Sequence, residues 1–169
     1  KNMIFSAKKK INLKIIIFEI SDFEAFSDFK NFNLIFSNMS LHWSLKFNTF
    51  FLKLIKSMNV NSVFIFSTPK TFTIKKSSSE NLYKNFINEF PDVNQCLNKL
   101  NHNYFFNHKE ETIEEEFDNI LSFFKNLKKI GANTQLKKKK INLYKLRTDK
   151  SKIIVKYKIN LVYIKKLGI

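Results

Sequence analysis

The segment from Leu34 to Ile74 constrains the fold most, because it predicts a strand, an amphipathic helix and a second strand in direct succession. Residues 33–37 form a short segment with an apolar centre, which predicts a strand. Residues 62–67 have the Val-Phe-Ile-Phe centre of a strand buried on both sides. Between them, residues 41–58 repeat apolar side chains every three or four positions, as a helix with one buried face does. Pro69 predicts a turn, and the alternation in 71–75 predicts a half-exposed strand with one side free to face phosphate.

Periodicity predicts further elements on both sides of this segment. Apolar residues recur at every fourth position before Pro91, which indicates a helix over residues 79–90. A short turn around residues 93–100 follows it. The other expected elements are a strand over 11–20, a short helix or turn over 21–29, a strand over 104–106 and a strand with alternating polarity over 153–164.

The segment that begins at Thr112 has the strongest helical pattern. Thr112 and Glu115 have the spacing of a capping box, and an apolar face continues to Leu127. Glutamates stand at the start of this segment, and lysines stand at its end ahead of Gly131, as the helix dipole favours. We therefore predict a helix here.

The charge of the chain points to a polyanionic partner. Its 169 residues, enough for one domain with extensions, carry 30 Lys and Arg against 14 Asp and Glu, a formal net charge of +16. Nucleic acid is the first partner to test and an anionic membrane surface the second. Arg147 is the only arginine, and Phe, Asn, Ile and Lys abound while Gly and Pro are scarce. Since arginine binds phosphate better than lysine, this usage indicates an AT-rich gene, either in an organelle or in an AT-rich nuclear or bacterial genome.

The sequence offers little for catalysis. Cys96 is the only cysteine, so no intrachain disulfide can form, and His42, His102 and His108 lack metal-ligand spacing. There is no Gly-rich phosphate loop and no nucleophile elbow. We therefore expect no enzyme, no cofactor and no small-molecule substrate. The apolar stretches are too short for a membrane span, so none is expected.

Cations dominate the C-terminal part, where Asp149 is the one acid beyond position 136. Such a run can follow a phosphate backbone, because each neutralised phosphate releases counterions. The alternative is a disordered, solvated tail, but the apolar and aromatic residues among the lysines favour an ordered extension that binds RNA. The candidate residues here are Lys137, Lys138, Lys139, Lys140, Lys145 and Arg147.

Several of these segments together resemble the S-ten family of organellar small-subunit ribosomal proteins, over about residues 32–141. The first strand, first helix and next strand of that family match residues 32–37, 41–58 and 60–67 without a gap. Thr68-Pro69-Lys70 is similar to its Pro-Thr-Lys turn, the strand from Phe72 to Ser77 to its aromatic-Thr-aliphatic-basic-Ser strand, and the segment from Phe123 to Ala132 to the helix and Gly-Ala turn of plant-type mitochondrial members.

The resemblance has departures. Ser78 and Ser79 stand where the family has a Pro-His pair, and its Ser-Arg-Glu-Gln-Phe stretch has no clean equivalent. We infer an insertion near residues 79–100, which puts the long hairpin of the family in doubt here. A competing alignment would place residues 11–29 on the first strand and helix, but it leaves the following helix unassigned.

The resemblance implies an α+β, ferredoxin-like fold with two helices against one face of a four-stranded sheet. Residues 1–31 would be an N-terminal extension, 32–141 the S-ten-like domain and 142–169 a basic C-terminal extension.

The function implied is that of a structural constituent of the small subunit of a mitochondrial ribosome, encoded in the mitochondrion and working in its matrix. Its partners would be small-subunit rRNA and neighbouring proteins of the subunit head. Lys70, Lys75, Lys76 and the C-terminal cations would contact rRNA. The alternatives are an accessory subunit of a respiratory complex, whose basic extension would face lipid or an acidic partner, and a nucleic-acid enzyme of a mobile organellar element, which would need clustered acids.

Overall fold

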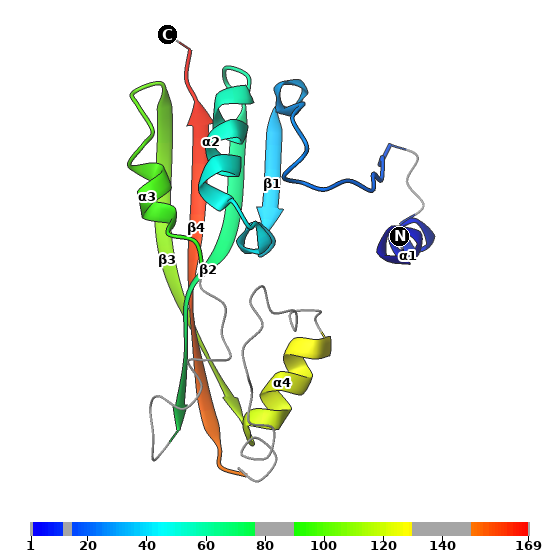
Figure 1. Cartoon of the computed structure of the whole chain (residues 1–169), viewed down its shortest axis with the longest axis vertical. Coiled ribbons are helices and arrows are strands. Elements are labelled where there is room, and N and C mark those ends of the chain that lie inside the picture. Colours follow the sequence, from blue (N-terminus) through cyan, green and yellow to red (C-terminus); the bar gives the residue numbers. More distant parts are fainter. Residues whose placement is uncertain (1, 12–14, 77–89, 130–149, 169) are drawn as a thin grey trace.

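The protein is built on one four-stranded mixed sheet with helices packed against it (Figure 1). This computed structural model describes residues 2–11, 15–76, 90–129 and 150–168. The strands are β1 (Leu34–Asn38), β2 (Val63–Lys76), β3 (Tyr104–Phe117) and β4 (Ile153–Lys166), and their spatial order is β1-β2-β4-β3. The helices are α1 (Asn2–Lys10), α2 (Phe47–Ser57), α3 (Val93–Leu97) and α4 (Ile120–Lys129), with short 3-10 turns η1 (Phe29–Asn31) and η2 (Leu41–Trp43).

The expected α+β class is confirmed, and the mixed sheet is compatible with a ferredoxin-like fold with extensions. β1 pairs with β2 in parallel across the connection that contains α2, whereas β4 pairs antiparallel with both β2 and β3. β4 lies in the segment 142–169 that we expected to be a basic extension, so this segment supplies a central strand. The segment 79–100, which the resemblance suggests is an insertion, contains α3, and its residues 79–89 lie outside the described part of the chain.

The long strands twist so far that the two ends of the sheet bury opposite faces. We name the faces by the numbers on β4: the even face carries Val162 and Ile164, and the odd face carries Ile153 and Val155, because successive side chains alternate. α2 packs on the even face in the upper half of Figure 1, and α4 packs on the odd face in the lower half.

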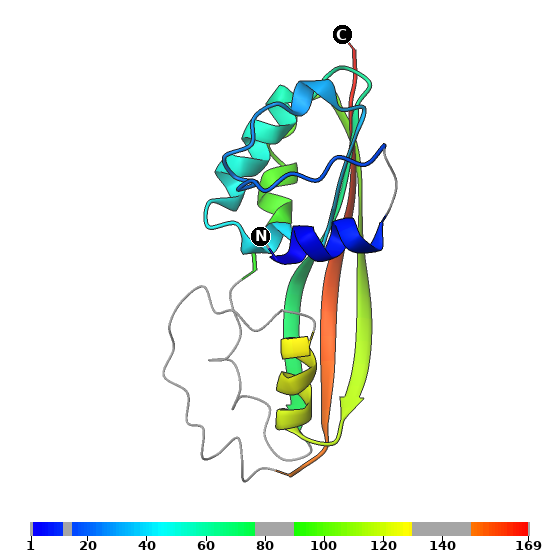
Figure 2. The same cartoon turned by 90° about the vertical axis from the view of Figure 1, so that its right-hand side faces the viewer.

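Right-handed twist reconciles these two packings in space. In Figure 1, β2 and β3 exchange sides of β4 between the top and the bottom of the sheet. Figure 2 shows that α2, α3 and α4 consequently lie on the same side of the molecule. The other side of the sheet carries none of these three helices.

The upper core joins α2 and α3 to the even face. The amphipathic stripe predicted for residues 41–58 is present, although the helix itself begins at Phe47 and η2 precedes it. Aromatic contacts are extensive: Phe51 meets Phe66 edge to face with ring centroids 6.0 Å apart, and Phe64 stacks on Phe66 with ring centroids 4.8 Å apart. The fully buried members include Phe51, Leu54, Ile55, Phe64, Phe66, Val93, Cys96 and Ile164.

The lower core is smaller and joins α4 to the odd face. Phe123 of α4 is 1% exposed and stacks on Phe72 of β2 at 5.2 Å. Asn119 caps this helix, since its side chain accepts a hydrogen bond from the backbone N–H of Ser122 at 3.0 Å. The other buried members are Ile74, Ile120, Ile153 and Val155.

Between the two cores, β2 has a bulge where the register shifts between Pro69 and Thr71. Pro69 was predicted to form a turn, but β2 continues through it. Proline has no backbone N–H to donate to the sheet, and a bulge is a place where a strand can do without that hydrogen bond. Two buried polar residues lie here: Asn160 is 2% exposed and Thr68 is 0% exposed. The amide oxygen of Asn160 lies 2.9 Å from Nε2 of His108, so its polarity is matched.

The predicted helix from Thr112 is wrong over its first part, because residues 104–117 form β3 and the helix begins at Ile120. Thr112 and Glu115 are therefore not a helix cap. β3 pairs with β4 along its whole length, from Tyr104 opposite Lys166 to Phe117 opposite Ile153. These long-range pairs outweigh the local helical preference of the segment.

The predicted strand over 11–20 is also wrong where the structure describes it. Ile15 and Ile17 are 88% and 91% exposed, and residues 15–20 pair with no strand. Without a partner strand, an apolar run gains nothing from an extended ladder. The region around 21–29, expected to be a short helix or turn, forms turns that end in η1.

Candidate nucleic-acid interface

Three of the nine predicted RNA-binding residues lie in the described part of the chain, all on β2. Lys70 is at the bulge, and Lys75 and Lys76 are near the end of the strand. The other six, Lys137, Lys138, Lys139, Lys140, Lys145 and Arg147, lie outside the described residues.

Lys70 is engaged within the protein. Its ammonium group forms an ion pair with the carboxylate of Glu110 on β3, and both side chains are about one-third exposed, at 36% and 37%. The hydrogen bond from Lys70 lowers the pKa of Glu110 below its ordinary value, so the carboxylate of Glu110 stays charged at neutral pH. The charge of Lys70 is therefore balanced within the protein by an acid of β3, on the far side of β4.

Lys75 belongs to an open polar surface in the lower half of the sheet. Here α4 covers the odd face, and the even face is exposed through Thr71, Thr73 and Lys75 of β2. Across β4 and β3 the same face continues with Lys156, Lys158, Thr112, Glu114 and Glu116, and Ile154 is its exposed apolar member. Within the described residues Lys75 makes no ion pair, so its charge is available to a ligand.

The glutamates of β3 balance much of the positive charge on this surface. Lys156 pairs with Glu114, and Lys152 lies 3.3 Å from Glu116. Sequence reasoning missed these contacts because it took the glutamates for the start of a helix. Their alternation with Thr112 along an extended strand was the available signal.

Some lysines of β4 are likewise held by contacts within the protein, and others form no ion pair with a described residue. Lys166 donates hydrogen bonds to the backbone oxygens of Met58 at 2.6 Å and Lys56 at 3.0 Å, which places a cation at the negative end of α2. Lys158 and Lys165 form no ion pair with any described residue, and both lie on β4 in the segment predicted to bind RNA.

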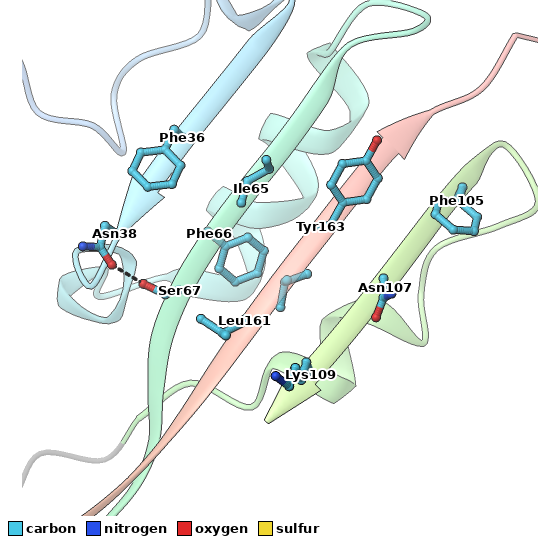
Figure 3. A pocket seen from close by; sticks show the side chains of 11 residues that line it. Phe36, Asn38, Ile65, Phe66, Ser67, Phe105, Asn107, Lys109, Leu161 and Tyr163 are labelled. Carbon is cyan, nitrogen blue, oxygen red and sulfur yellow. Dashed lines mark hydrogen bonds between the residues drawn. The ribbon is translucent and has the colours of Figure 1, made fainter. Parts of the chain in front are cut away.

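An open apolar surface lies in the upper half of the sheet, on the odd face opposite α2. Figure 3 shows side chains from all four strands lining a pocket of about 620 Å³ there. Phe36 is 67% exposed and Phe105 is 54% exposed, and Tyr163 lies between β2 and β3. We call this surface the aromatic face; it comprises Phe36, Asn38, Ile65, Ser67, Phe105, Asn107, Lys109, Leu161, Tyr163 and, by register, Lys165.

The register aligns these side chains in rows across the sheet. Phe36 is paired with Ile65, Ile65 with Tyr163, and Tyr163 with Asn107. The rings of Phe105 and Tyr163 meet edge to face, with centroids 6.2 Å apart. The strand over 62–67 was predicted to be buried on both sides, and this is wrong for the odd face, where Val63 and Ile65 are only half-buried.

Polar groups border the rings. Ser67 donates a hydrogen bond of 2.5 Å to the side-chain oxygen of Asn38, which fixes that amide at the edge of the pocket (Figure 3). Lys109 lies 2.7 Å from Glu111, yet its side chain is 71% exposed. The face thus combines exposed rings, amide groups and two lysines.

The remaining candidate groups are held in the interior. Cys96 is buried, and burial raises its pKa to about 11, so its thiol is neutral at ordinary pH. Burial also disfavours the charged form of His42, so it lowers the pKa of that imidazole. Among the described residues, no group of three His, Cys, Asp or Glu side chains lies close enough to hold a metal ion. None of the described helices is long and apolar enough to cross a membrane.

Comparison of the chain with protein-family models gives no match, and comparison with curated protein sequences gives none either.

Proposed function

We propose that this protein is a structural constituent of the small subunit of a mitochondrial ribosome, where it binds rRNA in the subunit head and works in the matrix. The observation that carries the proposal is the order of elements in the S-ten-like segment. β1, α2 and β2 occupy 34–38, 47–57 and 63–76, close to the positions that the resemblance assigns to the first strand, the first helix and the following strands.

Charge supports the same proposal. The net charge of +16 favours a polyanionic partner at a distance of several ångströms from the surface. The described cations without an ion pair include Lys75 and Lys158 on the lower open surface and Lys165 on the aromatic face. Lys76 and the cations from Lys137 to Arg147 are assigned to rRNA in the proposal by sequence alone.

The mechanism is electrostatic scaffolding and not catalysis. Lysines neutralise phosphates that crowd together in folded rRNA, and the sheet holds these lysines in a fixed register. Recognition of this kind depends on the shape of the RNA backbone. Glu110 and Glu114 limit the contact area, because they draw Lys70 and Lys156 into internal ion pairs.

Sedimentation of a mitochondrial lysate on sucrose gradients tests the proposal. The chain should migrate with the small ribosomal subunit at moderate salt and leave it only when high salt strips proteins from the particle. Migration with detergent-solubilised respiratory complexes would reject the proposal and favour the accessory-subunit alternative.

A further inference from the structure

We infer that the aromatic face binds single-stranded RNA by stacking unpaired bases on Phe36, Tyr163 and Phe105. This inference rests on the proposed function in that RNA is the partner, and it adds a specific site and a specific form of RNA. None of the nine candidate RNA-binding residues named from the sequence takes part in it.

The first argument is the contrast between the two open surfaces of one sheet. On the lower open surface, the outward positions are threonine, lysine and glutamate apart from Ile154, which is 42% exposed; Thr73, for example, lies opposite Lys156, which also faces Glu114. On the aromatic face, the corresponding row is Phe36, Ile65 and Tyr163. Folding therefore does not require rings on an uncovered face of this sheet, and exposed rings gathered in one place mark a binding surface.

The second argument is the geometry of the rings. Phe36 and Tyr163 are separated by one strand, a distance of about 10 Å from the spacing of neighbouring strands. Phe105 is one row away on β3 and contacts Tyr163. Aromatic side chains presented on an open sheet can each stack an unpaired base, which a double helix cannot offer because its bases are already stacked.

The third argument is the polar border of the pocket. The side chain of Asn38 is held by Ser67, and Asn107 makes no hydrogen bond with any described side chain, so amide groups are available to base edges. Lys165 lies in register between Val63 and Phe105, next to the rings, where it can neutralise a phosphate. A face with rings, amides and a lysine that forms no ion pair with any described residue is complementary to a nucleotide chain.

The charge distribution favours RNA over a protein as the occupant. The chain carries +16 overall, the described strand positions of the aromatic face carry no acid, and Lys109 forms an ion pair with Glu111, the next outward residue along β3. A hydrophobic protein partner would use the rings but would leave Lys165 and the amide of Asn107 without a role.

The test measures binding of the full chain to a fluorescein-labelled single-stranded RNA of about ten nucleotides and to a duplex of the same length, by fluorescence anisotropy. We expect the single strand to bind more tightly. Phe36→Ala and Phe105→Ala should each weaken single-strand binding about five-fold or more, the lower bound for the loss of one stacked base. Duplex binding and the salt dependence should stay unchanged, because no phosphate contact is removed.

Phe5→Ala is the matched control, since Phe5 lies on α1 and is 74% exposed. It removes an equally exposed ring elsewhere and should leave both affinities unchanged. Phe36→Tyr and Phe105→Tyr keep a ring and should retain binding. A single-stranded RNA that carries 2-aminopurine should lose fluorescence on binding the native chain, because stacking quenches this base. With the variant that combines Phe36→Ala and Phe105→Ala, the fluorescence should be retained.

Equal affinity for single strand and duplex, unchanged in Phe36→Ala and Phe105→Ala, would overturn the inference and leave the proposed function intact if the chain still migrates with the small subunit. Ring-dependent RNA binding without that migration would reject the proposed function alone. A third outcome is a dimer of the native chain, seen by light scattering, that these substitutions dissociate with RNA affinity unchanged. That result would identify the face as a protein interface and overturn the inference.

Discussion

The upper and lower halves of the sheet leave opposite faces uncovered, and they expose different chemistry there. In the upper half, helices cover the even face and leave the rings of the aromatic face in solvent. In the lower half, α4 covers the odd face and leaves a lattice of threonines and ion pairs, such as Lys156 with Glu114. The same three strands, β2, β3 and β4, build both halves.

The difference separates what folding requires from what binding uses. Phe66 is buried in the upper core and Phe123 in the lower core, while the lower open surface, made of polar side chains and Ile154, has no aromatic ring among its described residues. The rings of Phe36 and Phe105 should therefore contribute little to stability. Substitutions can test this difference between the buried rings and the exposed ones.

The largest expected effect separates two phenylalanines of the upper half. Phe66→Ala should lower the free energy of unfolding by about 3–5 kcal/mol, because its buried ring leaves a cavity. Phe36→Ala should lower it by less than about 0.5 kcal/mol, as for other exposed positions. Urea denaturation measures both. Comparable losses would mean that the aromatic face belongs to the folding core.

A smaller effect should arise where the two halves meet. Asn160→Leu removes the amide that faces His108 and Thr68, and we expect a loss of about 1–3 kcal/mol because buried polar partners are left unpaired. Thermal unfolding followed by circular dichroism checks this. Asn107→Leu, on the exposed odd face of β3, is the control and should change the melting temperature little.

The next effect depends on pH and concerns the N-terminal segment over the upper half. Glu24 accepts hydrogen bonds from the hydroxyl of Ser44 and the backbone N–H of Lys46, and these lower its pKa from the ordinary 4.5. A lowered pKa means that its stabilisation is present above pH 4.5 and is lost as the pH falls through the folded-state pKa.

Glu24→Gln should accordingly cost about 1 kcal/mol at neutral pH, and the difference from the native chain should shrink below pH 4.5. Urea titrations at several pH values measure it. A difference that grows in acid would refute the assigned sign. Glu19→Gln, on the same segment, provides the control and should change the free energy of unfolding little, because Glu19 accepts no hydrogen bond from any described residue.

The smallest effect belongs to the lower open surface. Glu114→Gln removes the partner of Lys156 and should change the free energy of unfolding by less than about 1 kcal/mol, since both side chains are partly exposed. It also frees a cation, so RNA affinity should rise modestly at low salt. Anisotropy at two salt concentrations would detect this, and an unchanged affinity would show that RNA does not reach the lower half.

Local periodicity predicted the parts of the fold that depend on local pattern. β1, the buried stripe of α2 and β4 were all recognisable, because alternation and helical spacing report which side of an element is buried. β3 was not, since its glutamates form ion pairs with lysines on β2 and β4 that lie forty or more positions away in the sequence, such as Lys70 and Lys156. Such pairs are invisible until the strands are aligned.

The candidate site shows the same division. Lys70 and Lys75 were identifiable as cations on a strand, but the engagement of Lys70 by Glu110 was not. The aromatic face needs the register of four strands to assemble Phe36, Phe105 and Tyr163, and each alone has the appearance of a core residue in the sequence.

The twist of the sheet has a consequence for any elongated partner. Because the faces change places along the strands, both uncovered surfaces look toward the same side, away from α2 and α4 (Figure 2). A partner lying lengthwise along that side meets rings at one end and charge pairs at the other. The molecule therefore has a built-in direction, and a bound chain reversed end to end would meet mismatched chemistry at both ends.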